Sequence, residues 1–207
     1  MAELLTDPRV GLPVPYIVAW SPETPTPPTV VRRHGPQGQY LGYADEHPGD
    51  RHWRGFLLPR ETLARGRGHA KFASIHTRRQ IRCMRDLLCQ VCAMPAHEDG
   101  ERSAVFLFAG TDRPVEGAVI AIPPVCPTCI PTAVSMCPRL RAGFTAVRAQ
   151  DSRPWGLKGV VHDPLTLDEL SGDELVPVAF DQLELCWMVG YRQLNSLHGL
   201  TEASVTT

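Results

Sequence analysis

The sequence predicts an α+β fold, for three reasons. Short β-like runs bounded by proline and glycine fill the first 60 residues, which favours an antiparallel sheet. Residues 75–88 then show helical periodicity without an internal glycine or proline. Beyond them, two alternating apolar runs lie between two Cys-x-x-Cys pairs. We therefore expect an N-terminal antiparallel β-sheet or half-barrel, a central hairpin and helix held at the cysteines, and a C-terminal helix.

The 207 residues are expected to form one compact unit with three regions. A hydrophobic content of 43% and a charged content of 21% are ordinary for a globular protein. The regions are 1–74, a β-rich N-terminal part; 75–140, an Arg-rich helix with the cysteine pairs; and 141–207, C-terminal strands and a helix.

The elements follow from local patterns, taken in chain order. The N-terminal strands are expected in the runs YIVAW (16–20), TVVRR (29–33), QYLGY (39–43) and WRGFLLP (53–59). In the helix at 75–88, Ile81, Met84, Leu87 and Leu88 form the apolar face. The other face should expose four arginines, Arg78, Arg79, Arg82 and Arg85.

The two runs between the cysteine pairs, 104–110 and 117–125, are joined by the turn TDRPVE and predict a β-hairpin. A short helix should follow, with Pro131 in its first turn. Residues 143–150 and 157–163 are expected as strands.

The final element is predicted as a helix over residues 180–200. Its presumed core face carries six residues at helical spacing: Leu183, Cys186, Trp187, Gly190, Tyr191 and Leu194.

The chain start has neither the basic residues nor the apolar run of a signal peptide, and no window reaches about 18 consecutive apolar residues. We therefore expect a cytoplasmic protein that does not enter membranes. Thiols stay reduced in the cytosol. An odd number of cysteines, seven, in that compartment favours metal binding over disulfides.

Four of these cysteines have the spacing of zinc ligands. Cys89 and Cys92 form one pair, and after 33 residues Cys126 and Cys129 form another. A Cys-x-x-Cys turn supplies two corners of a zinc tetrahedron, and two such pairs complete it. First pair, hairpin, second pair and helix is the order of a treble-clef zinc finger. We predict one structural Zn²⁺.

Other roles for the cysteines remain open at this stage. The four thiols could be apolar core, or one pair could be a redox dithiol, which would leave the other pair unexplained. Cys137 lies about two helical turns after Cys129 and either backs the site or packs in the core. Cys83 and Cys186 are expected in the core.

The segments LCQVC and PPVCPTC resemble the four-cysteine treble clef of HNH-type endonucleases and their degenerate relatives, over residues 86–140. The resemblance implies a zinc scaffold. It does not imply cleavage, because HNH catalysis needs a histidine on the hairpin and an asparagine beside a divalent metal. Here the only histidine between the pairs is His97, and the only asparagine is Asn195. The glycine that often follows such a turn is replaced by Ala93. The layout also resembles small high-GC bacterial and phage-type reading frames, which implies no function.

Charge is distributed unevenly, although the net charge is only −1. Residues 51–85 carry ten Arg or Lys against Glu61, while residues 159–207 carry eight acids against Arg192. These segments either face each other within the fold, or the basic segment binds nucleic acid or another anionic partner. Arg78, Arg79, Arg82 and Arg85 would then carry the affinity.

Two classes of function remain open. The first is a zinc-stabilised binding protein that contacts nucleic acid through residues 51–85. The second is a small enzyme, for example in natural-product tailoring, with a structural zinc and an aromatic pocket in the N-terminal β-region. The pocket would be lined by Tyr16, Trp20, Tyr40, Tyr43 and Trp53. No phosphate loop, nucleophile elbow or His-Glu-x-x-His motif is present. By their neighbourhood, His69 and His76 are the best acid–base candidates.

Overall fold

The computed structural model describes residues 4–36, 38–97, 102–172 and 174–204, and its fold is α+β, as predicted. Strands dominate and the helices are short. The strands are β1 (Val18–Trp20), β2 (Val30–Gly35), β3 (Gly38–Tyr43), β4 (Ala70–Ile75), β5 (Ala104–Ala109), β6 (Val119–Ile120), β7 (Phe144–Val161), β8 (Val176–Ala179) and β9 (Met188–Glu202). The helices are α1 (Thr77–Asp86), α2 (Ile130–Met136) and α3 (Pro138–Arg141), with 3-10 turns η1 (Pro48–Asp50), η2 (Pro127–Cys129) and η3 (Leu183–Trp187). Within the described ranges, no helix is long and apolar enough to cross a bilayer.

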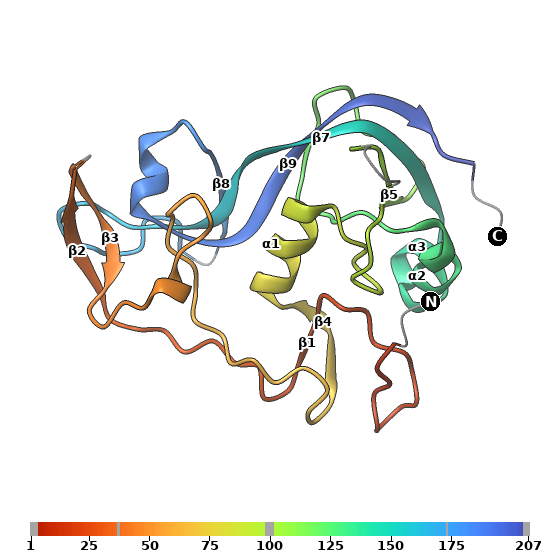
Figure 1. Cartoon of the computed structure of the whole chain (residues 1–207), viewed down its shortest axis with the longest axis horizontal. Coiled ribbons are helices and arrows are strands. Elements are labelled where there is room, and N and C mark those ends of the chain that lie inside the picture. The colour runs from red at the N-terminus through yellow and green to blue at the C-terminus, as the bar shows by residue number, and fades with distance from the viewer. Residues whose placement is uncertain (1–3, 37, 98–101, 173, 205–207) are drawn as a thin grey trace.

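A long antiparallel ribbon of β7 and β9 runs through the whole molecule (Figure 1). β5 pairs with the first half of β7, β8 pairs with its second half, and β6 pairs with β9. Gly156 and Gly159 sit where the ribbon register shifts. A Cβ on either glycine would lie 2.1 Å from a carbonyl oxygen of the neighbouring strand, so only glycine fits at these close approaches. The strands predicted at 143–150 and 157–163 are therefore parts of one element.

The C-terminal helix predicted for residues 180–200 is wrong. Only a short 3-10 turn forms, and the rest of the segment is β9. Leu183, expected in the core, is 84% exposed. Gln193, Asn195 and Leu197 lie on one face of β9 and are buried, and Leu194 is buried on the other face. Because both faces are covered there and two of these four residues are polar, the segment shows no strand-like alternation of hydrophobicity.

The hairpin predicted between the cysteine pairs is also wrong. β5 and β6 do not pair with each other. They lie at opposite edges of the sheet, with β7 and β9 between them. Two central strands supplied by the distant C-terminal part of the chain replace the local pairing that the turn sequence suggested.

The N-terminal region contains two separate two-stranded sheets, β1–β4 and β2–β3, in place of one sheet or half-barrel. Residues 53–59 form no strand. They make a tight loop in which the Gly55 amide donates to the His52 carbonyl, and Gly55 takes a positive φ of 89°. Only Leu57 bridges onward, to Val189 of β9.

Helix α1 lies under the β7–β9 ribbon and packs against β9 (Figure 1). The buried Gln80 amide donates to the carbonyl oxygens of Gln193 (3.0 Å) and Ala121 (2.8 Å), and its oxygen accepts from the Gln193 amide (2.9 Å). A buried amide with all of these partners fixes both the position and the rotation of the helix. The helix ends at Leu87, whose left-handed φ of 49° turns the chain toward the first cysteine pair.

Candidate functional site

The first cysteine pair lies on a tight turn directly after α1. The Val91 amide donates to the Cys89 sulfur (3.4 Å), and the Ala93 amide donates to the Cys89 carbonyl (2.8 Å). Closing this turn places Ala93 in the left-handed region with a φ of 62°. Glycine adopts that conformation without strain, which explains why a glycine is common at this position of zinc-binding turns.

The second pair opens α2. The Cys129 amide donates to the Cys126 carbonyl (2.9 Å) as the chain enters the helix, and Pro131 lies in the first turn, as predicted. Gln90 joins the two pairs: its amide donates to the Pro124 carbonyl (2.9 Å) and its side chain donates to the Pro123 carbonyl (3.0 Å).

The two turns bring four sulfur atoms together: Cys89, Cys92, Cys126 and Cys129 lie within 4.8 Å of one another. We call this set the cysteine cluster. A tetrahedral zinc–thiolate site with bonds of about 2.3 Å has sulfur–sulfur edges of about 3.8 Å. The Cys92 and Cys126 sulfurs are 3.7 Å apart. The cluster therefore fits a metal ion that prefers four thiolates.

The cluster sits within an apolar core formed with Val91, Val105, Val125 and Ile130. Burial raises the pKa of the Cys129 thiol to about 12, whereas the hydrogen bond from the Cys89 thiol lowers the pKa of Cys126 to about 4. Four sulfurs this close together can all be thiolates only when a cation neutralises them, so a bound metal ion would favour their deprotonation.

The other cysteines lie outside the cluster. Cys137 ends α2 and is half-buried. Cys83 is fully buried, as expected of a core residue. Cys186 is exposed, so its predicted core position is wrong, because η3 turns it outward where a helix would have buried it.

A second feature is a cavity of about 240 Å³ between α1 and the loop of residues 51–58, which we call the Arg cavity. The basic segment 51–85 supplies the whole lining: Arg51, His52, Trp53, Leu58, Arg78, Ile81, Arg82 and Arg85. Four arginines therefore line one hollow, although the guanidinium of Arg51 lies over the Tyr40 ring and pairs with Glu46. Three of the four arginines predicted on the helix face this cavity.

The charges of these arginines are compensated to different degrees. Arg51 pairs with Glu46, and Arg85 pairs with its neighbour Asp86. Arg78 donates to the Gly49 carbonyl (2.6 Å), and Arg82 lies 3.4 Å from the Tyr16 hydroxyl. Neither Arg78 nor Arg82 has a carboxylate partner in the described part of the chain, so both keep an uncompensated positive charge at the cavity.

The position of Arg79 differs from the sequence-based prediction. It was predicted on the exposed face, yet it is only 6% exposed, and its guanidinium makes a bidentate pair with the buried Glu23 (2.7 and 2.5 Å). Arg79 also donates to the Val18 carbonyl (2.8 Å). Its function is to anchor α1 to the N-terminal region, because a buried guanidinium requires such partners.

The two histidines proposed as acid–base groups line neither the Arg cavity nor the larger cavity described below. His69 is half-buried beside β4. His76 is buried at the start of α1, with Nδ1 3.3 Å from Glu61 and Nε2 4.0 Å from Glu23. Burial and the nearby Arg79 lower the pKa of His76.

The histidine that does line the Arg cavity, His52, is held as a neutral ring. Burial lowers its pKa to about 4, and the positive charges of Arg54 and Arg85 act in the same direction. Nδ1 accepts a hydrogen bond from the Arg54 amide (3.2 Å), and Nε2 lies 3.3 Å from Oε1 of Gln193. No feature of the sequence distinguished this histidine from the other seven.

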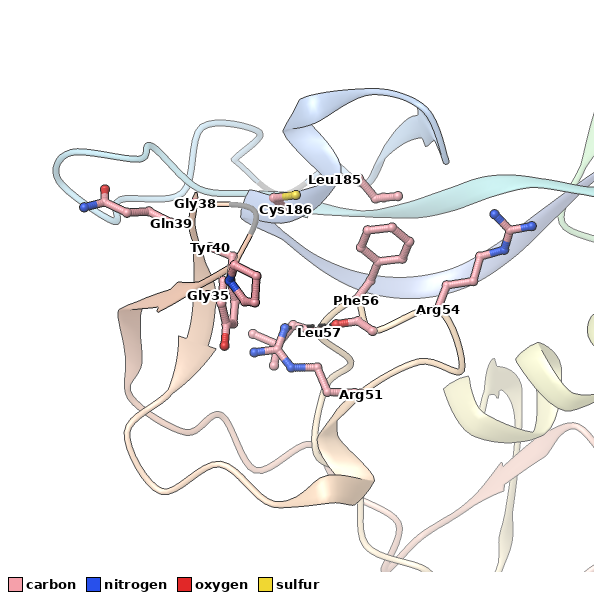
Figure 2. A pocket seen from close by; sticks show the side chains of 12 residues that line it. Gly35, Gly38, Gln39, Tyr40, Arg51, Arg54, Phe56, Leu57, Leu185 and Cys186 are labelled. Atoms are coloured by element: carbon pink, nitrogen blue, oxygen red, sulfur yellow. Dashed lines mark hydrogen bonds between the residues drawn. The ribbon is translucent and has the colours of Figure 1, made fainter.

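A larger cavity of about 480 Å³ opens between β2–β3, the loop 54–57 and η3 (Figure 2). Tyr40, Phe56, Leu57 and Leu185 give it an apolar wall, and the Cys186 thiol lies at its edge. The aromatic pocket predicted from the sequence is not one site. Of its five residues, Tyr40 alone lines this cavity; Trp53 lines the Arg cavity; and Trp20, Tyr16 and Tyr43 line neither.

No family model, curated protein or solved structure matches the chain.

Replacing one cluster residue tests the metal site. Cys126→Ser should lose the ion, because a serine hydroxyl does not replace a thiolate ligand. Structural zinc contributes on the order of 10 kcal/mol to local folding, so residues 86–140 should also become sensitive to protease. Elemental analysis should find one zinc per chain in the native protein. The control Cys186→Ser, outside the cluster, should retain it, whereas a native protein that is stable without metal would contradict the assignment.

Ala93→Gly should stabilise the protein by roughly 0.5–1 kcal/mol, because removing the side chain relieves the left-handed strain by more than the added flexibility of the unfolded chain costs. The measurement is chemical denaturation of both proteins at a fixed excess of zinc. A loss of stability would show that the turn does not have this geometry.

His52 should make the fold sensitive to mild acid. Its pKa is depressed in the folded state, so protons bind preferentially to the unfolded chain as the pH falls below about 6.5, and stability is lost down to pH 4. The loss attributable to His52 should be about 2–4 kcal/mol. The measured quantity is the difference in unfolding free energy between the native protein and His52→Asn. This difference should shrink between pH 7 and pH 4.5, and a constant difference would contradict the prediction.

Proposed function

We propose that this protein is a zinc-stabilised binding protein that contacts nucleic acid through the Arg cavity. The observation that carries the proposal is the convergence of Arg51, Arg78, Arg82 and Arg85 on one hollow. Guanidinium groups without carboxylate partners are the usual ligands of phosphate groups. Within the described ranges Arg78 and Arg82 meet this condition, whereas Arg51 and Arg85 are paired with Glu46 and Asp86. The cavity places Arg78 and Arg82 side by side, although the chain as a whole is almost neutral.

The metal in this proposal is Zn²⁺, and its function is structural. Four thiolates complete the tetrahedron and leave no position for water or substrate, whereas catalytic zinc keeps one open position. A cytoplasmic location would keep the thiols reduced. In this proposal the scaffold would be a degenerate relative of the treble clef of HNH-type proteins that has lost the local hairpin, because β5 and β6 pair with β7 and β9.

Zinc and the Arg cavity are connected through α1. The helix presents Arg78, Arg82 and Arg85 on one side, and only Leu87 and Leu88 separate its last residue from Cys89. Metal binding would therefore fix the C-terminal end of the helix, while Arg79 and Gln80 hold its N-terminal half. A phosphate-binding surface gains affinity when its cationic groups are preorganised in this way.

A second candidate function uses the larger cavity. Its volume of about 480 Å³ is in the range of small-molecule sites, and it combines aromatic walls with an exposed thiol at Cys186. This arrangement favours the alternative of a small enzyme or ligand-binding protein with structural zinc.

Charge reversal at the Arg cavity tests the first proposal. The double variant Arg78→Glu/Arg82→Glu should bind a labelled oligonucleotide at least about 100-fold more weakly, and the slope of log affinity against log salt should decrease by about 2. The control Arg139→Glu/Arg141→Glu makes the same charge change on the exposed end of α3 and should leave binding nearly unchanged. An equal loss of oligonucleotide affinity in both double variants would show that binding depends only on the net charge of the protein. Binding of a neutral ligand that is insensitive to salt would favour the second candidate.

A further inference from the structure

Trp53 ends a stack of aromatic and cationic groups at the rim of the Arg cavity. The rings of Phe56 and Phe180 stack with centroids 5.8 Å apart and planes 18° apart. The Arg54 guanidinium lies 4.5 Å from the Phe180 centroid and 4.7 Å from the Trp53 centroid. Arg54 therefore lies against both rings, and it covers one face of the indole.

The indole is held by this stack and yet remains accessible. His52, itself buried and within 3.3 Å of the Gln193 side chain, packs against it with ring centroids 5.3 Å apart and planes tilted by 40°. Trp53 is nevertheless 48% exposed. Trp53 lines the same cavity as Arg78 and Arg82, so part of its exposed surface faces that hollow. A large aromatic ring kept in place and left open is a binding surface for another flat ring.

The position of α1 argues against binding of a duplex. A helix reads double-stranded DNA by entering the major groove with a protruding face. Here the arginine face of α1 forms the wall of a hollow, and the loop of Arg51, His52 and Trp53 makes the opposite wall. The loop prevents the helix from entering a groove. The volume of about 240 Å³ has room for one base or one phosphate group, and none for a double helix.

We propose that the Arg cavity binds single-stranded nucleic acid, with one base stacked on the exposed part of the Trp53 indole and the adjacent phosphates held by Arg78 and Arg82. This inference rests on the proposed function and narrows it. Bases in single strands can leave their neighbours and stack on an aromatic side chain, and the binding is tolerant of sequence because every base has a flat face. Arginines beside the ring supply the phosphate contacts and the salt dependence.

The experiment compares a labelled 12-nucleotide oligo-dT with a labelled duplex of the same length, by fluorescence anisotropy at low salt. The native protein should prefer the single strand. Trp53→Ala should weaken single-strand binding about 10- to 100-fold. Trp53→Phe keeps a smaller stacking ring and should lose much less. Leu183→Ala removes an apolar side chain that is even more exposed and lies far along the sequence, and it should change nothing.

Tryptophan emission gives a second measurement that needs no destabilising variant. Oligo-dT should quench the fluorescence of the native protein, and Trp53→Phe should bind with little quenching. Circular dichroism establishes that each variant is folded. Binding that depends on Arg78 and Arg82 but is equal for duplex and single strand, or unchanged in a folded Trp53→Ala, would overturn this inference and leave the proposed function intact. If the native protein bound neither oligonucleotide in a salt-dependent manner, the proposed function itself would be contradicted.

Discussion

The packing of α1 on β9 is the constraint on which the rest of the structure depends. Gln80 exchanges hydrogen bonds with the Gln193 backbone in a fully buried position, and Arg79 fixes the same helix to Glu23. Both contacts use side chains next to the exposed arginines. The buried polar side chains of α1 therefore set the orientation of the helix. That orientation in turn determines where the arginines on its other side point.

The buried polar chain continues beyond the helix. Gln193 donates to Asn195, and Asn195 donates to the Met84 carbonyl and to the Ser152 hydroxyl. At its other end, the Gln193 side chain lies 3.3 Å from His52, whose ring packs against that of Trp53. Each amide has partners on both sides, which is the condition under which a buried polar network gives a unique arrangement. The network links the sheet to the wall of the Arg cavity, which His52 itself lines.

The sequence predicted what is encoded locally. The cysteine pairs were recognisable because a Cys-x-x-Cys turn is a local structure, and α1 was recognisable because its apolar residues repeat at helical spacing. The errors concern long-range partners. β9 buries the polar residues Gln193 and Asn195, so hydrophobicity alone did not reveal it as a strand. Arg79 is buried because it pairs with Glu23, which lies 56 residues earlier in the chain. The contacts of β9 and of Arg79 cannot be identified without knowing the fold. The position of Trp53 beside the arginines of α1 likewise depends on the fold.

The central claim is that metal binding at one end of α1 organises nucleic-acid binding on its side. The most direct measurement is the dissociation constant of a labelled single-stranded oligonucleotide for the zinc-loaded protein and for the same protein after chelation, at one ionic strength. Circular dichroism follows the fold in parallel. Our account predicts much weaker binding after chelation, restored by one equivalent of zinc per chain. Equal affinity with and without metal, in a protein that binds zinc, would contradict it.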